Sequence, residues 1–553
     1  MGALLALLTT GACGAGSPEA GTLHLGVAQA PESLDPRFAT SAVASRLAQL
    51  VVAPLCVIAD DLRPRPLLAE RIETSDDGLL VDVSLRAGLR FQDGHPVRAD
   101  DVVFTWDSML RGDPSPGGAP SPHRGRLDMI AALEATDDLT VRFTLKRPHA
   151  PFVADVLCAF GPVSKRSCQK QDCRMAPVGA GPFSVEHGPD AQERILLSPW
   201  SGFAAAGRVP GRQLEVRVVR DATSRLLELR SGRLDLVVGD IAPWDVSMLA
   251  SGGVDPDPLG LVRSPRAVGA DPALRVHQRP GLGVAYLGLN VRGVSGAEAA
   301  GGQRMRTQRA LADPRVRRAL AQSLDLDAII HGRLKGRARR ASSLLPDGHW
   351  AHDSNLLPLP QDLAAAARAF DDAGFPRDEH GHRFPLTLLT TPDRLRQSVA
   401  VAVAEQLRAV GIEVTVRVRD WSVLYDDIQH GAFDAFIAKW TPVVEPDLLR
   451  WVFHSGNIPR PGKGGANRGG YTDVVIDAWL DTARAGDEKS RRILYQAVEA
   501  RLQQEMPLVP LWVEDEIAVA SARAADFVLV RTASLLPIAD AAPFLAPAQE
   551  SPR

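Results

Sequence analysis

The sequence lacks a long apolar segment. Beyond the N-terminus no apolar run reaches the roughly 18 residues of a membrane-spanning helix, so no such helix is expected. A strong excess of one charge is also missing, because the formal net charge is only −3. This balance gives no basic face for nucleic acid.

Motifs for catalysis and metal binding are absent too. The chain has no Gly-x-Ser-x-Gly elbow, no His-Glu-x-x-His helix and no cysteine in a convincing nucleophile setting. It also lacks the repeated Cys-x-x-Cys of a four-cysteine zinc site. His380 and His382 fit a solvated loop better than a metal site. We therefore expect no enzyme, no metal and no cofactor, with a secreted hydrolase as the rival interpretation.

What the chain does have is length: 553 residues are too many for one core and predict two or more lobes. Its 47 glycines and 42 prolines indicate many turns and a mixed α/β structure rather than a helical bundle.

The stretch Val81–Leu110 reads as a strand, a turn and a helix. Val81, Val83 and Leu85 alternate with polar residues, as in a half-buried strand. Asp93-Gly94 then supplies a turn, and the helix after it begins with two acids, Asp100 and Asp101.

The order of residues in this stretch, LRAGLRFQDGHPVRADDVVFTW, resembles the signature of the bacterial extracellular solute-binding proteins of family 5. Members of that family hand peptides, nickel complexes and other solutes to membrane ABC importers. Further stretches resemble the family in the same order: PVGAGPFSVE (177–186), VAYLGLN (284–290), RVRRALAQSLDLDAII (315–330), the run from QLRAVGIEV to DAFIAKW (406–440) and PLVPLWV (507–513).

One segment predicts a complete α/β unit from the residues alone. Pro385–Thr390 is expected to be a strand, Arg394–Val410 a helix and Ile412–Val418 a second strand. Gly411 ends the helix. This length suits a crossover between parallel strands. In contrast, 251–274 and 292–308 are poor in periodicity and are expected to be loops.

The resemblance implies an α/β fold of the periplasmic-binding-protein type, a two-lobed clamp with mixed sheets in the large, three-segment type II variant. The expected divisions are 1–21 (signal or lipoprotein segment and tether), 22–275 (lobe one, with a subdomain inserted at 67–176), 276–501 (lobe two), 502–545 (return to lobe one) and 546–553 (disordered tail).

The resemblance also implies a function. Solute is expected to bind between the lobes, and hinge closure then presents it to the ABC permease. The expected protein is a monomer that captures a peptide or peptide-like solute. A receptor for a non-peptide ligand and a signalling receptor stay open as alternatives.

The candidate ligand residues come mainly from the loop after Trp440. In peptide-binding relatives this loop carries an acid that pairs with the α-amino group of the peptide. Val443 and Val444 lie about where that acid is expected, so Glu445, with Asp447 beyond it, is the nearest candidate. The other expected ligand contacts are Trp440 itself, Trp421, Tyr471 and Asp35. For each of them a role in the core or in a surface loop is the competing interpretation.

The cysteines point to an exported protein. Thr10-Gly11-Ala12-Cys13 follows a short apolar run and resembles a lipoprotein cleavage box, so lipidation of Cys13 is expected, with an ordinary secretory signal as the alternative. Location in the periplasm or on the outer face of the cytoplasmic membrane follows. Cys168 and Cys173 flank a short polar loop and are expected to form a disulfide. Cys56 and Cys158 could be paired or could be buried thiols.

Overall fold

The computed structural model describes residues 21–114, 119–203, 211–239, 241, 246, 261–262, 274–292, 303–460 and 464–541. Some predictions lie outside these ranges: the lipidation of Cys13, the tail at 546–553 and most of the loop at 251–274.

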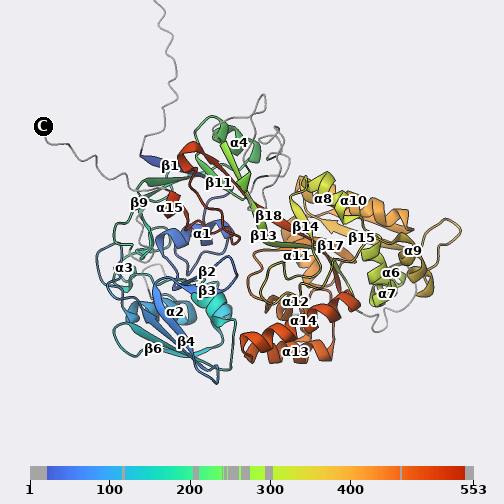
Figure 1. The fold of residues 1–553 in the computed structure, drawn as a ribbon, viewed down its shortest axis with the longest axis horizontal. Coiled ribbons are helices and arrows are strands. Elements are labelled where there is room, and N and C mark those ends of the chain that lie inside the picture. Colours follow the sequence, from blue (N-terminus) through green and yellow to red (C-terminus); the bar gives the residue numbers. More distant parts are fainter. Residues whose placement is uncertain are drawn as a thin grey trace, which may run out of the picture.

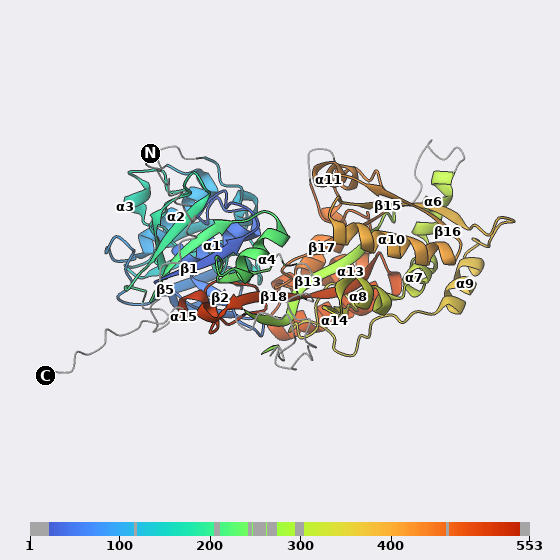
Figure 2. The same cartoon turned by 90° about the horizontal axis from the view of Figure 1, so that it is seen from above.

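Two lobes lie side by side and are joined by two long antiparallel strands (Figures 1 and 2). These strands are β13 (Leu274–Leu289) and β18 (Leu508–Ser521). Each passes through both lobes. We call lobe one the described residues up to 279 and from 515 onward, and lobe two those from 283 to 514.

The crossing lies later in the chain than the predicted boundaries, of which 276 lies within β13 and 502 precedes β18. Val276 still packs in the core of lobe one, and Leu511 is fully buried in the core of lobe two. The reason is that β13 and β18 each contribute side chains to the cores of both lobes. The boundary between the lobes therefore falls inside these strands and not at their ends.

One large sheet runs through the whole molecule. Its order is β16-β15-β17-β13-β18-β11-β1-β10-β9-β8, with β12 paired to β13 and β14 paired to β18. The strands other than β13 and β18 are β1 (Thr22–Val27), β8 (Phe183–His187), β9 (Arg194–Pro199), β10 (Gln213–Val218), β11 (Leu236–Val238), β12 (Leu261–Val262), β14 (Ala338–Arg340), β15 (Phe384–Thr390), β16 (Ile412–Val418) and β17 (Ala435–Trp440).

Lobe one contains a second, four-stranded sheet in the order β4-β5-β7-β6. It packs against helix α2, whose Trp106 is fully buried beside Phe143 of β7. The predicted strand, turn and helix of 81–110 are present here as β5 and α2. The elements of this part are β2 (Cys56–Ile58), β3 (Pro64–Pro66), β4 (Ala69–Thr74), β5 (Leu80–Leu85), α2 (Ala99–Arg111), η1 (Arg124–Leu127), β6 (Ile130–Ala135), β7 (Thr140–Leu145) and η2 (Val153–Leu157).

The remaining helices of lobe one are α1 (Ala42–Val51), α3 (Lys165–Cys168), α4 (Ala222–Arg230), the short turn η5 (Ala522–Ala524) and α15 (Ile538–Ala541).

In lobe two, helices cover both faces of the sheet. Neighbouring residues of β13 show why: Leu287 points into one core and Tyr286 into the other, because successive side chains of a strand alternate. The first core is shared with α6 (Gln303–Ala312), α7 (Pro314–Gln322), α8 (Leu326–Leu334), α9 (Leu363–Asp372) and α10 (Arg394–Ala409). The second is shared with α11 (Trp421–Gln429), α12 (Leu448–Phe453), α13 (Val474–Ala485) and α14 (Glu488–Glu505). A short turn, η4 (Ser455–Asn457), follows α12.

The predicted α/β unit is confirmed. β15 and β16 are parallel, in register from Phe384 with Ile412 to Thr390 with Val418, and α10 connects them. The loop predicted at 292–308 is wrong in its last part, because α6 already begins at Gln303. Most residues of α6 are polar, so the apolar spacing that indicates a helix is weak in the sequence.

Both cysteine pairs of the described chain form disulfides. Cys56 is joined to Cys158 and Cys168 to Cys173, and all four residues lie in lobe one. The first disulfide links the start of β2 to the end of η2.

Candidate functional site

The main cavity is a cleft of about 720 Å³ between the two lobes. From lobe one it is lined by residues that follow β1, β10 and β11, namely Ala28, 221–223 and Gly239. From lobe two it is lined by 393–396, after β15, and by Lys439 of β17. β1, β10 and β11 run parallel to one another, as do β15, β16 and β17. The carboxyl ends of parallel strands are the usual ligand position in α/β sheets, and here two such edges face each other.

The two joining strands form the floor of this cleft. Gly283 and Ala285 of β13 and the segment 514–517 of β18 contribute to its lining. The pairing register shifts between Pro280 and Gly283, where the chain passes from one lobe to the other. At Gly281 a Cβ atom would lie 2.4 Å from the carbonyl oxygen of Glu514, so this close strand contact requires glycine. This irregular crossing is the natural hinge.

A helix begins on each side of the cleft. Asp221 caps α4 by accepting a hydrogen bond from the amide of Ser224, and Asp393 caps α10 in the same way through the amide of Arg396. The first turn of a helix carries partial positive charge. Arg394, like Arg396, is exposed in the first turn of α10, so this turn places two positive charges next to the Asp393 carboxylate on the lobe-two side.

Lys439 is the second basic element of the lobe-two wall. Its Nζ atom lies 2.6 Å from Oε2 of Glu514 on the hinge strand. Burial acts to lower the pKa of Lys439, but the Glu514 carboxylate outweighs burial and raises it. The cleft therefore contains an ammonium group that stays charged and is anchored at the hinge.

A row of aromatic rings extends from the core of lobe two to its surface. Tyr286 stacks on Trp440, with ring centroids 6.3 Å apart and planes at 7°. The Arg468 guanidinium lies over both Trp440 and Tyr425, 5.2 and 5.3 Å from their centroids. Tyr425 contacts Trp421, which is 50% exposed. The structure thus brings the predicted residues Trp440 and Trp421 into one wall through Arg468 and Tyr425, which the sequence did not single out.

Glu445 and Asp447 lie deeper than expected. Glu445 is buried and forms an ion pair with Arg491 of α14. Asp447 faces Arg484 of α13, with Oδ2 and Nε 3.5 Å apart. Burial raises the pKa of the Asp447 carboxyl to about 6. The charge of the predicted amine-binding acid is therefore already met by a cation of the protein itself.

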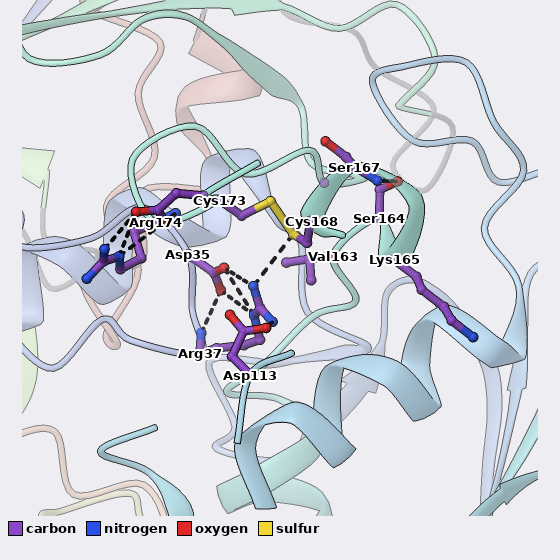
Figure 3. The surroundings of a disulfide bond; sticks show 12 residues. Asp35, Arg37, Asp113, Val163, Ser164, Lys165, Ser167, Cys168, Cys173 and Arg174 are labelled. Carbon is purple, nitrogen blue, oxygen red and sulfur yellow. Dashed lines mark hydrogen bonds and ion pairs between the residues drawn. A yellow bond between two sulfur atoms is a disulfide. The ribbon is translucent and has the colours of Figure 1, made fainter. Parts of the chain in front are cut away.

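Asp35 has a structural partner. It is fully buried, and its Oδ2 lies 2.7 Å from Nη2 of Arg37, whose other guanidinium nitrogen lies 3.1 Å from Asp113 (Figure 3). The same Nη2 lies 3.5 Å from Sγ of Cys168, so the predicted disulfide covers this charged centre. Asp35 fixes the turn after β1 through these contacts.

Tyr471 is also buried, and its hydroxyl donates to the Asp473 carboxylate at 3.1 Å. It lines a small cavity of about 30 Å³ next to Tyr286. None of the six predicted ligand residues lines the 720 Å³ cleft, so their ligand roles stay predictions. Sequence reasoning missed Lys439, Arg394 and Arg396. The signal that could have found them was their position: Lys439 lies at the end of a predicted strand, and the two arginines follow another.

The described residues contain no group of three or more His, Cys, Asp or Glu side chains that could hold a metal ion. Within the same ranges, none of the helices combines the length and the apolar character needed to span a bilayer.

Comparison with known proteins gives the family. The pattern of the bacterial extracellular solute-binding proteins, family 5 Middle, matches residues 63–459, more than half of the chain. The chain belongs to this family. Its members are solute-binding proteins found outside the cytoplasm, and the clamp with its inter-lobe cleft is the architecture of such a protein.

Individual relatives match along almost the whole chain. The di/tripeptide-binding protein 2 of Pseudomonas aeruginosa is 26% identical, and the match covers 92% of each chain. The oligopeptide-binding protein AppA of Bacillus subtilis is 24% identical over 90% of this chain and 87% of its own. The crystal structure of the ABC transporter substrate-binding protein CtaP of Listeria monocytogenes has a TM-score of 0.76 at 22% identity, over 94% of this chain and 98% of that one. This structural likeness shows the same two-lobed fold.

Proposed function

We propose that this protein is the substrate-binding component of an ABC importer and that it carries a peptide or peptide-like solute in the inter-lobe cleft. The observation that supports this most is the geometry of the cleft, in which two sets of strand ends and two helix N-termini face each other across a hinge. The named relatives for dipeptides, tripeptides and oligopeptides support the solute class.

The cleft offers a basic end for an anionic group of the solute. Arg394 and Arg396 lie at the N-terminus of α10, where backbone amides and the helix dipole favour a carboxylate. Lys439 lies nearer the hinge, where its ammonium group is already paired with Glu514, so the assignment rests on the two arginines. We assign the terminal carboxylate of the solute to this end.

The aromatic wall is assigned to the side chains of the solute. Trp421 opens α11 just beyond the carboxyl end of β16, at the same edge of the sheet as the basic end. An exposed ring there, backed by the guanidinium of Arg468, suits a planar or apolar side chain. Trp440 and Trp421 therefore remain the better of the predicted ligand residues. Asp35 and Tyr471 are assigned a supporting role at the base of their loops.

A non-peptide solute or a solute-sensing role is the second candidate. It is favoured by the ion pair between Glu445 and Arg491, since an acid that already has an internal cation is a weak anchor for an α-amino group. In both versions the function is recognition without catalysis, by a monomer held outside the cytoplasmic membrane through a lipid on Cys13.

Native mass spectrometry of protein purified from the cell envelope tests the proposal, because a closed clamp retains its solute. We expect a peptide-like adduct that is lost or at least tenfold weaker in Arg394→Ala/Arg396→Ala. Arg309→Ala removes an exposed arginine from α6, away from the cleft lining, and serves as the matched control. A catalytic turnover of the solute, or an adduct equally strong in the double variant, would contradict the assignment.

A further inference from the structure

A second contact joins the lobes away from the hinge strands. The segment around η2 of lobe one meets α13 and α14 of lobe two, and the amide of Ala150 donates to the carbonyl oxygen of Arg484 at 2.9 Å. At the rim of this contact, Nη2 of Arg63 lies 2.7 Å from Oε1 of Glu488. Figure 1 shows the four-stranded part of lobe one beside α13 and α14 at this place.

Carboxylates from both lobes lie within electrostatic reach of one another at this contact. Asp155 of η2 belongs to lobe one, and its charge acts on both Glu445 and Asp447 of lobe two. Like charges brought together from opposite lobes repel each other, and the repulsion ends when the lobes separate. A proton on one of these groups removes it as well.

The carboxylates are incompletely compensated. Glu445 has a direct cation, Arg491, but Asp447 lies 3.5 Å from Arg484, and its Oδ1 atom is buried without a hydrogen-bond partner among the described residues. The Asp155 carboxylate is attracted by Arg126, Arg491 and Arg484, and Nη2 of Arg126 donates a hydrogen bond to the Asp155 carbonyl oxygen at 2.6 Å. The other charged or titratable groups facing the cluster are Arg147, Arg450, His149, His349 and Tyr495.

We propose that this contact is a proton-operated latch, in which closure of the lobes takes up a proton on the Asp155 and Asp447 carboxylates. The latch holds the clamp shut more firmly under mildly acidic than under alkaline conditions. It rests on the proposed function, because it regulates the hinge closure by which the solute is enclosed.

The direction of the effect follows from linkage. Burial raises the pKa of Asp155, raises that of Asp447 from its ordinary value of 3.8 to about 6, and raises that of Glu445 from 4.5 to about 8 against the attraction of Arg491. Opening returns these carboxyls to water and toward their ordinary values, so the closed form binds more protons and gains stability as the pH falls from about 8 through about 6. His149 does not interfere, since burial and then Arg484 lower its pKa to about 3 and keep it neutral over this range.

The Ala150 amide reports on the latch, because its partner belongs to the other lobe. Hydrogen–deuterium exchange of peptides covering 147–157 is measured at pH 5.0 and 8.0 and corrected for intrinsic exchange. For the solute-free wild type we expect at least about tenfold greater protection at pH 5.0, because Asp447 alone, with a pKa that moves between 3.8 and about 6, accounts for about tenfold.

Two variants and a matched control decide the result. Asp155→Asn should reduce the pH dependence, and Asp447→Asn, on the other lobe, should do the same. Glu488→Gln removes an inter-lobe acid whose pKa is lowered by Arg63, so it should keep the full pH dependence of the wild type. Equal protection of the wild type at both pH values, or an unchanged ratio in both Asp variants, would overturn the latch. Solute retention is read separately by native mass spectrometry at pH 7, so failure of the latch and failure of solute binding are distinguishable.

Discussion

The two lobes of this clamp differ in how they are built and in what they offer to a solute. Lobe one contains both disulfides and the buried centre of Arg37, Asp35 and Asp113, and its side of the cleft combines turns and a helix cap with the acids Asp515 and Glu516. Lobe two contains no cysteine, yet it supplies Lys439, the arginines of α10 and the aromatic wall. The comparison teaches that the aromatic rings and the arginines of α10 belong to lobe two, whereas lobe one is the cross-linked partner across the cleft.

The largest expected effect is on lobe one. Replacing Cys56 and Cys158 by Ser opens a loop with a sequence separation of 102 and should cost about 4 to 5 kcal/mol of the free energy of unfolding. The same change at Cys168 and Cys173, only 5 residues apart, should cost about 2 kcal/mol. Urea unfolding followed by limited proteolysis measures both. Equal losses for the two pairs would contradict cross-linking as the basis of lobe-one stability.

Lobe two should depend on packing instead. Leu407 of α10 is fully buried in its first core, so Leu407→Ala should cost about 3 kcal/mol, whereas reducing agents should leave this lobe unaffected. Unfolding followed by hydrogen–deuterium exchange of peptides from α10, with and without reductant, measures both effects. Loss of lobe two on reduction would mean that the lobes do not stabilise themselves independently.

Much of this difference could be predicted from the sequence. The spacing of Cys168 and Cys173 indicated their disulfide, and the unit from Pro385 to Val418 was predictable because each of its elements has a clear period and a stop. The partner of Cys56 could not be identified, since its pairing depends on tertiary placement across some hundred residues.

The site was harder to predict than the fold. Glu445 was correctly placed in a loop after a strand, but nothing local shows that Arg491, 46 residues later, would pair with it. Trp440 and Trp421 were each identified from the sequence. Arg468, whose guanidinium lies over Trp440 and Tyr425, was not, because it comes from a glycine-rich loop without hydrophobic periodicity. Lys439 was missed because the direction of its side chain depends on how β17 pairs with β13, and the sequence does not show this pairing register.

Glu445→Gln sharpens the contrast between the two lobe-two sites. Because Glu445 is paired with Arg491 and lies outside the cleft lining, we expect solute affinity to change less than threefold, while stability falls by about 3 kcal/mol. Isothermal titration with the identified solute and urea unfolding test both parts. A tenfold or greater loss of affinity for a cationic solute, with stability unchanged, would restore Glu445 as the ligand anchor.

The smallest effect concerns the start of lobe one. The Glu32 carboxylate accepts hydrogen bonds from the amide and hydroxyl of Ser41 at 2.6 and 2.7 Å, and although its partial burial acts to raise its pKa, these bonds lower it from 4.5 to about 2. A lowered pKa contributes stability that is present above pH 4.5 and is lost as the pH falls toward 2. Glu32→Gln should therefore cost about 1 kcal/mol at pH 7, small because the side chain is exposed, and nothing near pH 2. Thermal unfolding over this pH range would contradict the assignment if the variant and the wild type stayed parallel.

The most direct test of the central claim is a crystal structure of the protein with the solute it retains from the cell envelope. The account predicts solute density in the 720 Å³ cleft, with its anionic group at the N-terminus of α10 and the lobes closed about the crossing at 280–283. Solute bound instead beside Glu445 and Arg491, or outside the two facing edges of strand ends, would contradict it.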